Sequence, residues 1–171
     1  MAADFDTLRL GEDPKPIEVG SSKEILQASV ALLGQTRRTL EIVSRHLDPA
    51  IYDTGEFTDA LRRFAINSRN ARIRIIVMDS TPIAGSGHRT ILLAQRLSSY
   101  IEIRNPGRQH ASYNSAFLLA DQVGSIYQTL ADRFEGVVNF GDRRAAQGLS
   151  DLFEEMWPLA VPDPNMRRLS I

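Results

Sequence analysis

The side chains best suited to chemistry gather in the segment "DSTPIAGSGHRT". Asp79 opens it, Gly85 and Gly87 loosen its backbone, and His88 and Arg89 close it where a helical pattern begins. Backbone amides at a helix start, a histidine and an arginine fork together form a common kind of anion site. No lysine follows the last glycine, so the segment is not a Walker-type phosphate loop. A flexible loop carrying a solvated His-Arg pair is the alternative interpretation.

A second polar group follows another apolar run, because "SRHLDP" places Arg45 and His46 directly after "TLEIV". Ligands of open α/β sheets bind beyond the carboxyl ends of the strands. Arg45 and His46 could therefore meet the Asp79 loop, or they could simply face solvent on either side of their strand. The candidate ligand-binding residues are Arg45, His46, Asp79, His88, Arg89 and Arg104.

Several reaction classes lack the residues they require. The chain has no cysteine, which excludes disulfides, thiolate catalysis and cysteine-ligated metals. Its three histidines show neither HxH nor HExxH spacing, so we expect no metal site and no cofactor. No GxSxG elbow is present, so a serine hydrolase has no support either.

The composition is that of an ordinary globular domain, with 43% hydrophobic and 24% charged residues. A net charge of −1 provides no global field for nucleic acid or anionic membranes, although it leaves room for a local basic patch. The basic residues are eighteen arginines and two lysines, which reflects either codon usage or a need for planar forks that bind phosphate. No apolar stretch approaches the roughly 20 residues that cross a bilayer, and the acidic N-terminus does not resemble a signal peptide. We therefore expect a cytoplasmic protein without membrane insertion.

Hydrophobic periodicity supplies the elements that must position these residues. A capping box of Ser21 and Glu24 begins a first helix, and Asp142 is a plausible cap for the last one. Helices are predicted at 21–35, 55–69, 88–99 and 142–157, and strands at 38–47, 71–79, 100–104, 116–121, 124–129 and 135–140. This order predicts an α/β fold with a mixed, mainly parallel sheet and helices on both faces. Residues 1–20 are expected to form a loosely attached arm, and residues 21–171 a single domain with a Pro-broken tail.

The element order and the segment "NSAFLLADQVGSI" resemble the half-domain of the phospholipase D superfamily. In that family the first strand of a hairpin carries a His-x-Lys motif followed, after four intervening residues, by an aspartate. Here Asp121 falls on the aspartate, Ala116 on the lysine and Asn114 on the histidine. Gly124 and Ser125 lie near the place of a Gly-Ser pair common in the family, at shorter spacing.

These departures bear on catalysis, because the family's histidine attacks phosphorus and its lysine neutralises the developing charge. Asn114 and Ala116 cannot do either job. The leading hypothesis is a non-catalytic module that binds an anionic, phosphate-containing ligand or a protein partner. The alternatives are a phosphodiesterase or nuclease with displaced residues, for example His110, and a purely structural interaction domain. Asp121 is expected to be structural and to hydrogen-bond the turn that follows it.

A closer resemblance is to an uncharacterised bacterial family with this degenerate fold, often found C-terminal to a GNAT-type N-acetyltransferase domain. It rests on "VMDSTP", "GHRTILLAQRLSSYIEIR", "AFLLAD" and "LFEEMWPLAVPDPNMRRLSI". The resemblance implies no established activity, but it makes an acetyltransferase a candidate partner. Because catalytic superfamily members pair two half-domains, and because Trp157, Leu159 and Val161 need cover, we also expect a homodimer.

Overall fold

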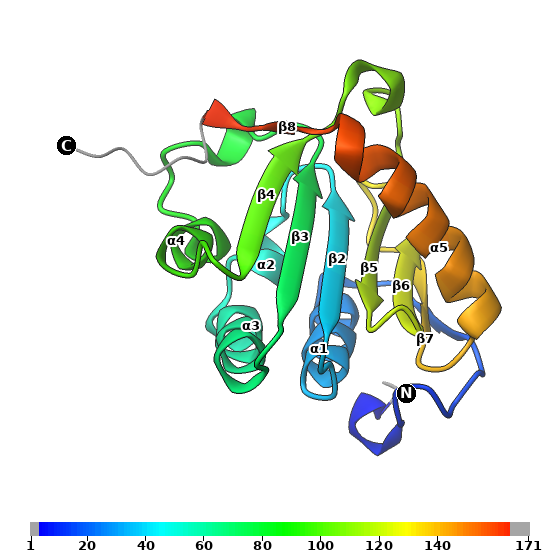
Figure 1. Ribbon diagram of the computed structural model, residues 1–171. Coiled ribbons are helices and arrows are strands. Elements are labelled where there is room, and N and C mark those ends of the chain that lie inside the picture. Colours follow the sequence, from blue (N-terminus) through cyan, green and yellow to red (C-terminus); the bar gives the residue numbers. More distant parts are fainter. Residues whose placement is uncertain (1–3, 165–171) are drawn as a thin grey trace.

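An eight-stranded mixed sheet with helices on both faces forms the body of the protein (Figure 1). The computed structural model describes residues 4–164. The strands are β1 (Ile17–Val19), β2 (Thr39–Ser44), β3 (Arg72–Val77), β4 (Ile101–Asn105), β5 (Ala116–Ala120), β6 (Gly124–Gln128), β7 (Gly136–Asn139) and β8 (Val161–Pro162). The α-helices are α1 (Ser22–Leu33), α2 (Pro49–Tyr52), α3 (Gly55–Asn67), α4 (Arg89–Arg96) and α5 (Arg143–Met156). Short 3-10 turns are η1 (Phe5–Thr7), η2 (Thr81–Ile83), η3 (Arg108–His110) and η4 (Trp157–Leu159).

The strand order is β1-β7-β6-β5-β2-β3-β4-β8. The predicted α/β class, with a mixed sheet and helices on both faces, is confirmed, but the expectation of a mainly parallel sheet is wrong. Among the strands of residues 4–164, only the β2–β3 and β3–β4 pairings are parallel, and the other five are antiparallel. Helical connections join β2, β3 and β4, whereas β5, β6 and β7 follow one another through short turns that reverse the chain.

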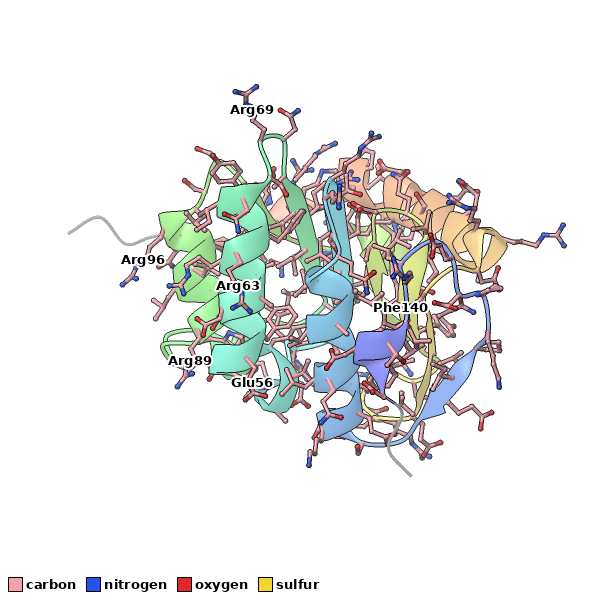
Figure 2. The ribbon with its side chains drawn as sticks, turned by 90° about the horizontal axis from the view of Figure 1, so that it is seen from below. Glu56, Arg63, Arg69, Arg89, Arg96 and Phe140 are labelled. Carbon is pink, nitrogen blue, oxygen red and sulfur yellow. The ribbon has the colours of Figure 1, made fainter. Side chains whose placement is uncertain are left out.

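Two cores lie on the two faces of the sheet. Helices α1, α3 and α4 cover one face, and α5 lies on the other, as the view in Figure 2 shows. The caps that open the outer helices agree with the sequence: Ser21 Oγ accepts from the Glu24 amide, and Asp142 Oδ1 accepts from the Ala145 amide. Within residues 4–164, no helix is both long enough and apolar enough to cross a bilayer.

Residues 4–20 are packed against the domain, so the expected loose attachment of the arm is wrong. Phe5 is buried and its ring stacks on that of Phe140, with centroids 6.5 Å apart. The Gln35 side-chain amide donates to Leu8 O and accepts from Leu10 N, both at 2.8 Å. β1 then extends the sheet by pairing with β7. The sequence offered no periodic signal here, because the contacts are made by scattered residues rather than by one face of a helix or strand.

Asp121 ties the β5–β6 hairpin to the start of β2. It forms the tight turn with Gln122, and both residues have positive φ, at 50° and 60°. Its carboxylate accepts three backbone hydrogen bonds, from Arg37 N, Arg38 N and Thr39 N, at 2.8–3.0 Å. The expected partner was the turn that follows Asp121, but the amides come from the segment that leads into β2. The hydrogen bonds therefore join elements more than 80 residues apart in the sequence.

A buried ionic cluster lies between the sheet and α5. Glu41 on β2 and Arg74 on β3 are register partners and are only 1% and 3% exposed. The Arg74 guanidinium donates to both carboxylate oxygens of Glu154 from α5 at 2.5 and 3.2 Å, and it lies 3.5 Å from Glu41 Oε2. It also lies over the rings of Phe153 and Trp157, 4.9 and 5.7 Å from their centroids.

Glu41 is the member of this cluster whose charged form is unfavourable. Neither of its carboxylate oxygens has a hydrogen-bond partner among the described residues. Burial raises the pKa of Glu41 to about 7, although the nearby Arg74 charge acts in the opposite direction. Hydrogen bonds from Arg74 lower the pKa of Glu154. Arg74 is therefore shared unequally, and its main anionic partner is the more exposed Glu154.

Removal of the Asp121 carboxylate should destabilise the fold. Asp121→Ala leaves three backbone amides without their acceptor and places alanine at positive φ, so we expect a loss of about 2 kcal/mol or more in the free energy of unfolding. Asp121→Asn should lose less, because its amide oxygen still accepts and asparagine tolerates this backbone. Urea denaturation measures both variants, with the exposed Asp132→Ala as control. Unfolding midpoints equal to that of the parent would contradict a structural role.

The raised pKa of Glu41 predicts a pH dependence of stability. In the folded protein Glu41 holds its proton up to about pH 7, whereas its ordinary value is 4.5. Stability should therefore fall as the pH rises from 4.5 to 7, because the unfolded state gains free energy by ionising Glu41 while the folded state keeps the proton. Glu41→Gln should remove that loss and be more stable than the parent at pH 8, by up to about 3 kcal/mol.

At pH 4 the Glu41→Gln variant and the parent should unfold at nearly the same urea concentration. The exposed Glu56→Gln variant is the matched control, and it should follow the parent at both pH values. A Glu41→Gln variant that is less stable than the parent at pH 8 would show that the Glu41 charge is favourable where it lies.

Candidate functional site

Polar side chains lie together where the central strands β2 and β3 end and β5 begins. This end of the sheet is at the top in Figure 1. Arg45 follows β2, and Asn114 lies two residues before β5. Because β5 runs antiparallel to β2, its beginning meets the end of β2. Arg45 Nη1 donates to Asn114 Oδ1 at 2.7 Å, and both side chains are exposed. We call Arg45, His46, Asp79 and Asn114 the upper edge.

His46 and Asp79 complete the upper edge. The Asp79 amide continues the β2–β3 pairing by donating to Arg45 O at 2.8 Å. His46 Nδ1 lies 2.9 Å from Asp79 O and 3.9 Å from its carboxylate Oδ2. Hydrogen bonding from Thr81 is the main cause that lowers the pKa of Asp79, and the charges of His46 and Arg45 act in the same direction. Asp79 is therefore an ionised, hydrogen-bonded carboxylate beside an exposed arginine.

His88 has a structural position, and its assignment as a ligand-binding residue is wrong. It is 1% exposed and caps α4, with Nδ1 accepting from Thr90 N at 3.2 Å. Nε2 lies 2.9 Å from Leu47 O. Since Nδ1 accepts and Nε2 faces a carbonyl, the ring is the neutral tautomer protonated at Nε2. Both nitrogens are used within the fold, as burial requires, so neither is available to an anion.

Arg89 lies apart from the upper edge, on the outer surface of α3 and α4. Its backbone amide donates to Asp53 Oδ1 at 2.9 Å, and its Nε lies 3.9 Å from the same oxygen. It lines a groove of about 210 Å³ with Arg62 and Arg96. Figure 2 shows Arg63, Arg89 and Arg96 on this helical surface.

Arg104 lies on the opposite face of the sheet, under α5. Its Nη1 donates to Trp157 O at 3.0 Å, its guanidinium lies 4.1 Å from a Trp157 ring centroid, and its Nε pairs with Glu102. Strand alternation decides this, because Arg104 is the register partner of Ile76, which belongs to the α5-side core. The structure thus brings Arg45, His46 and Asp79 together, whereas Arg89 and Arg104 bond to groups outside the upper edge.

The positions that the phospholipase D resemblance assigns to the family's histidine and lysine are occupied by Asn114 and Ala116. Ala116 is buried at the first residue of β5, and Asn114 is held by Arg45. His110, the candidate displaced nucleophile, points its Nε2 at Glu155 of α5, 3.7 Å away, while its buried Nδ1 has no partner among the described residues. No cluster of three or more His, Asp or Glu residues within 4–164 could hold a metal ion.

Asn114 is the upper-edge residue that sequence reasoning did not place among the ligand-binding candidates. Its position at the motif's histidine was the available signal, because that position must open onto the site whatever residue occupies it. Its contact with Arg45 depends on the pairing of two strands about 70 residues apart, which no local pattern encodes.

Solved structures share this fold at low sequence identity. NucT from Helicobacter pylori is similar with a TM-score of 0.61 and 13% identity, over 87% of this chain and 99% of NucT. Nuc from Salmonella typhimurium, a phospholipase D family member, has a TM-score of 0.56 and 13% identity, over 90% of this chain and all of Nuc. The expected phospholipase D-like fold is therefore confirmed, and at these identities the likeness establishes the fold alone.

The archaeal chromatin protein TrmBL2 is also similar, with a TM-score of 0.64 and 14% identity over 87% of this chain. This chain spans about half of that protein, 54% of its length. A search of curated proteins found no match. A domain family of unknown function, DUF7931, matches residues 21–169, which include the upper edge and every element from α1 to β8. The chain belongs to this family.

Proposed function

We propose that this protein is a non-catalytic phospholipase D-like module that binds a phosphate-containing anion at its upper edge. The observation that carries the proposal is the exposed Arg45 guanidinium, bonded to Asn114 at the place of the superfamily's histidine. One Arg45 donor is engaged by the amide oxygen, and the remaining donors of the fork stay available to an oxyanion. An amide in place of the histidine thus orients a cation rather than supplying a nucleophile.

The local charges are compatible with a bound anion. Asp79 would repel a bare anion, but its carboxylate accepts from Thr81 N and has His46 beside it. The guanidinium of Arg45 and the side-chain NH2 group of Asn114 supply hydrogen-bond donors for the ligand. TrmBL2, which shares this fold, is a chromatin protein that binds DNA, and this adds support for a phosphate-containing ligand.

Catalysis by the family's route has no support from the residues present. Ala116 carries no ammonium group to balance charge at phosphorus, and Asn114 has no nucleophilic nitrogen. Loss of a positioned nucleophile and loss of a charge-stabilising group each typically reduce the rate by orders of magnitude.

The homodimer, the acetyltransferase partner and the cytoplasmic location all stay predictions. The dimer draws support from the exposed side chains of Leu159 and Val161, at 43% and 53%.

We expect no phosphodiesterase turnover above background. The assay uses bis-p-nitrophenyl phosphate and single-stranded DNA with micromolar enzyme, and the control is a preparation of His110→Ala purified in the same way. Because neither reacting group is present, the parent and the variant should both match the buffer blank. Turnover by the parent that disappears in His110→Ala would instead favour an enzyme with displaced residues.

Binding at the upper edge should depend on Arg45. Short oligonucleotides titrated into the parent should raise its melting temperature according to their concentration relative to Kd. Arg45→Gln should weaken that binding about tenfold, because it removes a charge-assisted fork while keeping a polar side chain. Arg69→Gln is the matched control, since Figure 2 shows Arg69 projecting from the loop after α3.

Equal oligonucleotide binding by the parent and Arg45→Gln would exclude the upper edge as the site. If the parent bound none of the oligonucleotides, the module would be better explained as a structural interaction domain.

A further inference from the structure

A polar cavity of about 450 Å³ lies at the opposite end of the sheet from the upper edge. We call it the foot cavity. Asp121, which follows β5, lines the foot cavity, whereas Asn114, which precedes β5, belongs to the upper edge. The length of β5 therefore separates the two sites. Four segments distant in the sequence form its walls: the arm, the α1–β2 loop, the β5–β6 turn and the start of α5. The lining residues are Leu10, Gly11, Gly34, Gln35, Thr36, Arg37, Asp121, Val123 and Arg143.

The fold brings two Arg-Arg pairs to this cavity. Arg37 and Arg143 line it directly, and Arg38 and Arg144 are their chain neighbours. All four side chains are exposed. Within residues 4–164, none of these four guanidinium groups makes a hydrogen bond or an ion pair. Their charges are therefore not neutralised by the fold itself.

Two carboxylates beside the cavity, those of Asp121 and Asp142, are used by the backbone. Asp121 accepts from the amides of residues 37–39, and Asp142 caps α5 by accepting from Ala145 N. These bonds direct the carboxylate oxygens at N–H groups and leave the arginine forks without an acidic partner. The cavity lining thus carries two arginines against one carboxylate that is already triply hydrogen-bonded.

The cavity wall contributed by the arm is held in place before any ligand arrives. Gln35 bridges Leu8 O and Leu10 N, and Gly11 N donates to Phe140 O at 2.6 Å. Gly11 has a φ of +87°, a conformation that favours glycine, and a Cβ there would lie 3.5 Å from Arg143 Nη2. The arm and the start of α5 are therefore in close contact, and a ligand would not have to order the arm.

We infer that the foot cavity binds a small phosphorylated molecule, with Arg37 and Arg143 holding the phosphate. Two unpaired guanidinium forks from different walls suit a doubly charged phosphate group. The volume exceeds that of the phosphate alone and leaves space for an organic part of the ligand. This site is independent of the proposed function, because none of its lining residues belongs to the upper edge.

Isothermal titration with inorganic phosphate, pyrophosphate and adenosine monophosphate tests the inference. The parent, the double variant Arg37→Gln/Arg143→Gln, Arg45→Gln and Arg69→Gln are compared at constant ionic strength. The double variant should bind the phosphorylated probes at least about tenfold more weakly than the parent. Arg69→Gln, altered in the exposed loop after α3, is the control and should keep the parent affinity for them. Both substituted foot residues are exposed, and Arg37→Gln retains the backbone amide that Asp121 needs, so the fold should persist, as circular dichroism would verify.

Two results would overturn the foot cavity: no binding of any of the three probes to the parent, or equal affinities for the parent and the double variant. Loss of probe binding in Arg45→Gln, with the double variant unchanged, would assign the phosphate to the upper edge instead. Stronger binding of adenosine monophosphate than of inorganic phosphate would support an organic part in the cavity. The proposed anion site at the upper edge is tested separately, by comparing oligonucleotide binding of Arg45→Gln with that of the parent.

Discussion

The antiparallel pairing of β5 with β2 is the constraint on which both ends of the molecule depend. The strands are paired from Leu40–Ala120 to Val43–Phe117. Beyond one end of this ladder Arg45 meets Asn114, and beyond the other the Asp121 carboxylate meets the amides that lead into β2. A slip by one residue would exchange the two faces of β5 and break both contacts together. Asp121 thus affects the upper edge indirectly. Its hydrogen bonds to the start of β2 help to hold the register of β5, and that register places Asn114 beside Arg45.

The same strand explains how a phospholipase D-like fold can persist without the superfamily's catalytic groups. Ala116 is buried within the sheet, where a methyl group is accommodated without an unsatisfied polar atom. Asn114 remains at the exposed edge and keeps a polar contact there. An alanine and an asparagine at these two positions are therefore compatible with an intact sheet.

The ionic cluster beneath α5 contains one favourable contact, between Arg74 and Glu154, and one unfavourable group, the buried carboxylate of Glu41. Arg74 links β3 to Glu154 of α5 and lies against two aromatic rings, so it helps to fix the helix on the sheet. Glu41 lies in the same cluster without a hydrogen-bond partner in residues 4–164, and its ionisation is unfavourable. Buried ion pairs often contribute little net stability because desolvation offsets their attraction. The cluster is better understood as a device that sets where α5 docks than as a source of stability.

Much of the architecture could be predicted from the sequence, because it follows from local periodicity and capping. The helices after Ser21 and Asp142, the strand before Asp79 and the hairpin at Asp121 all arise from patterns within a few residues. The absent His-x-Lys pair could also be identified from the sequence alone. Tertiary structure alone decided which side chains meet. His88 is buried as a cap, Arg89 and Arg104 bond to groups outside the upper edge, and Arg37 and Arg143 line one cavity. The physical reason is that these contacts depend on strand parity, on the direction in which each strand joins the sheet and on long-range packing of the arm, none of which is encoded by neighbouring residues.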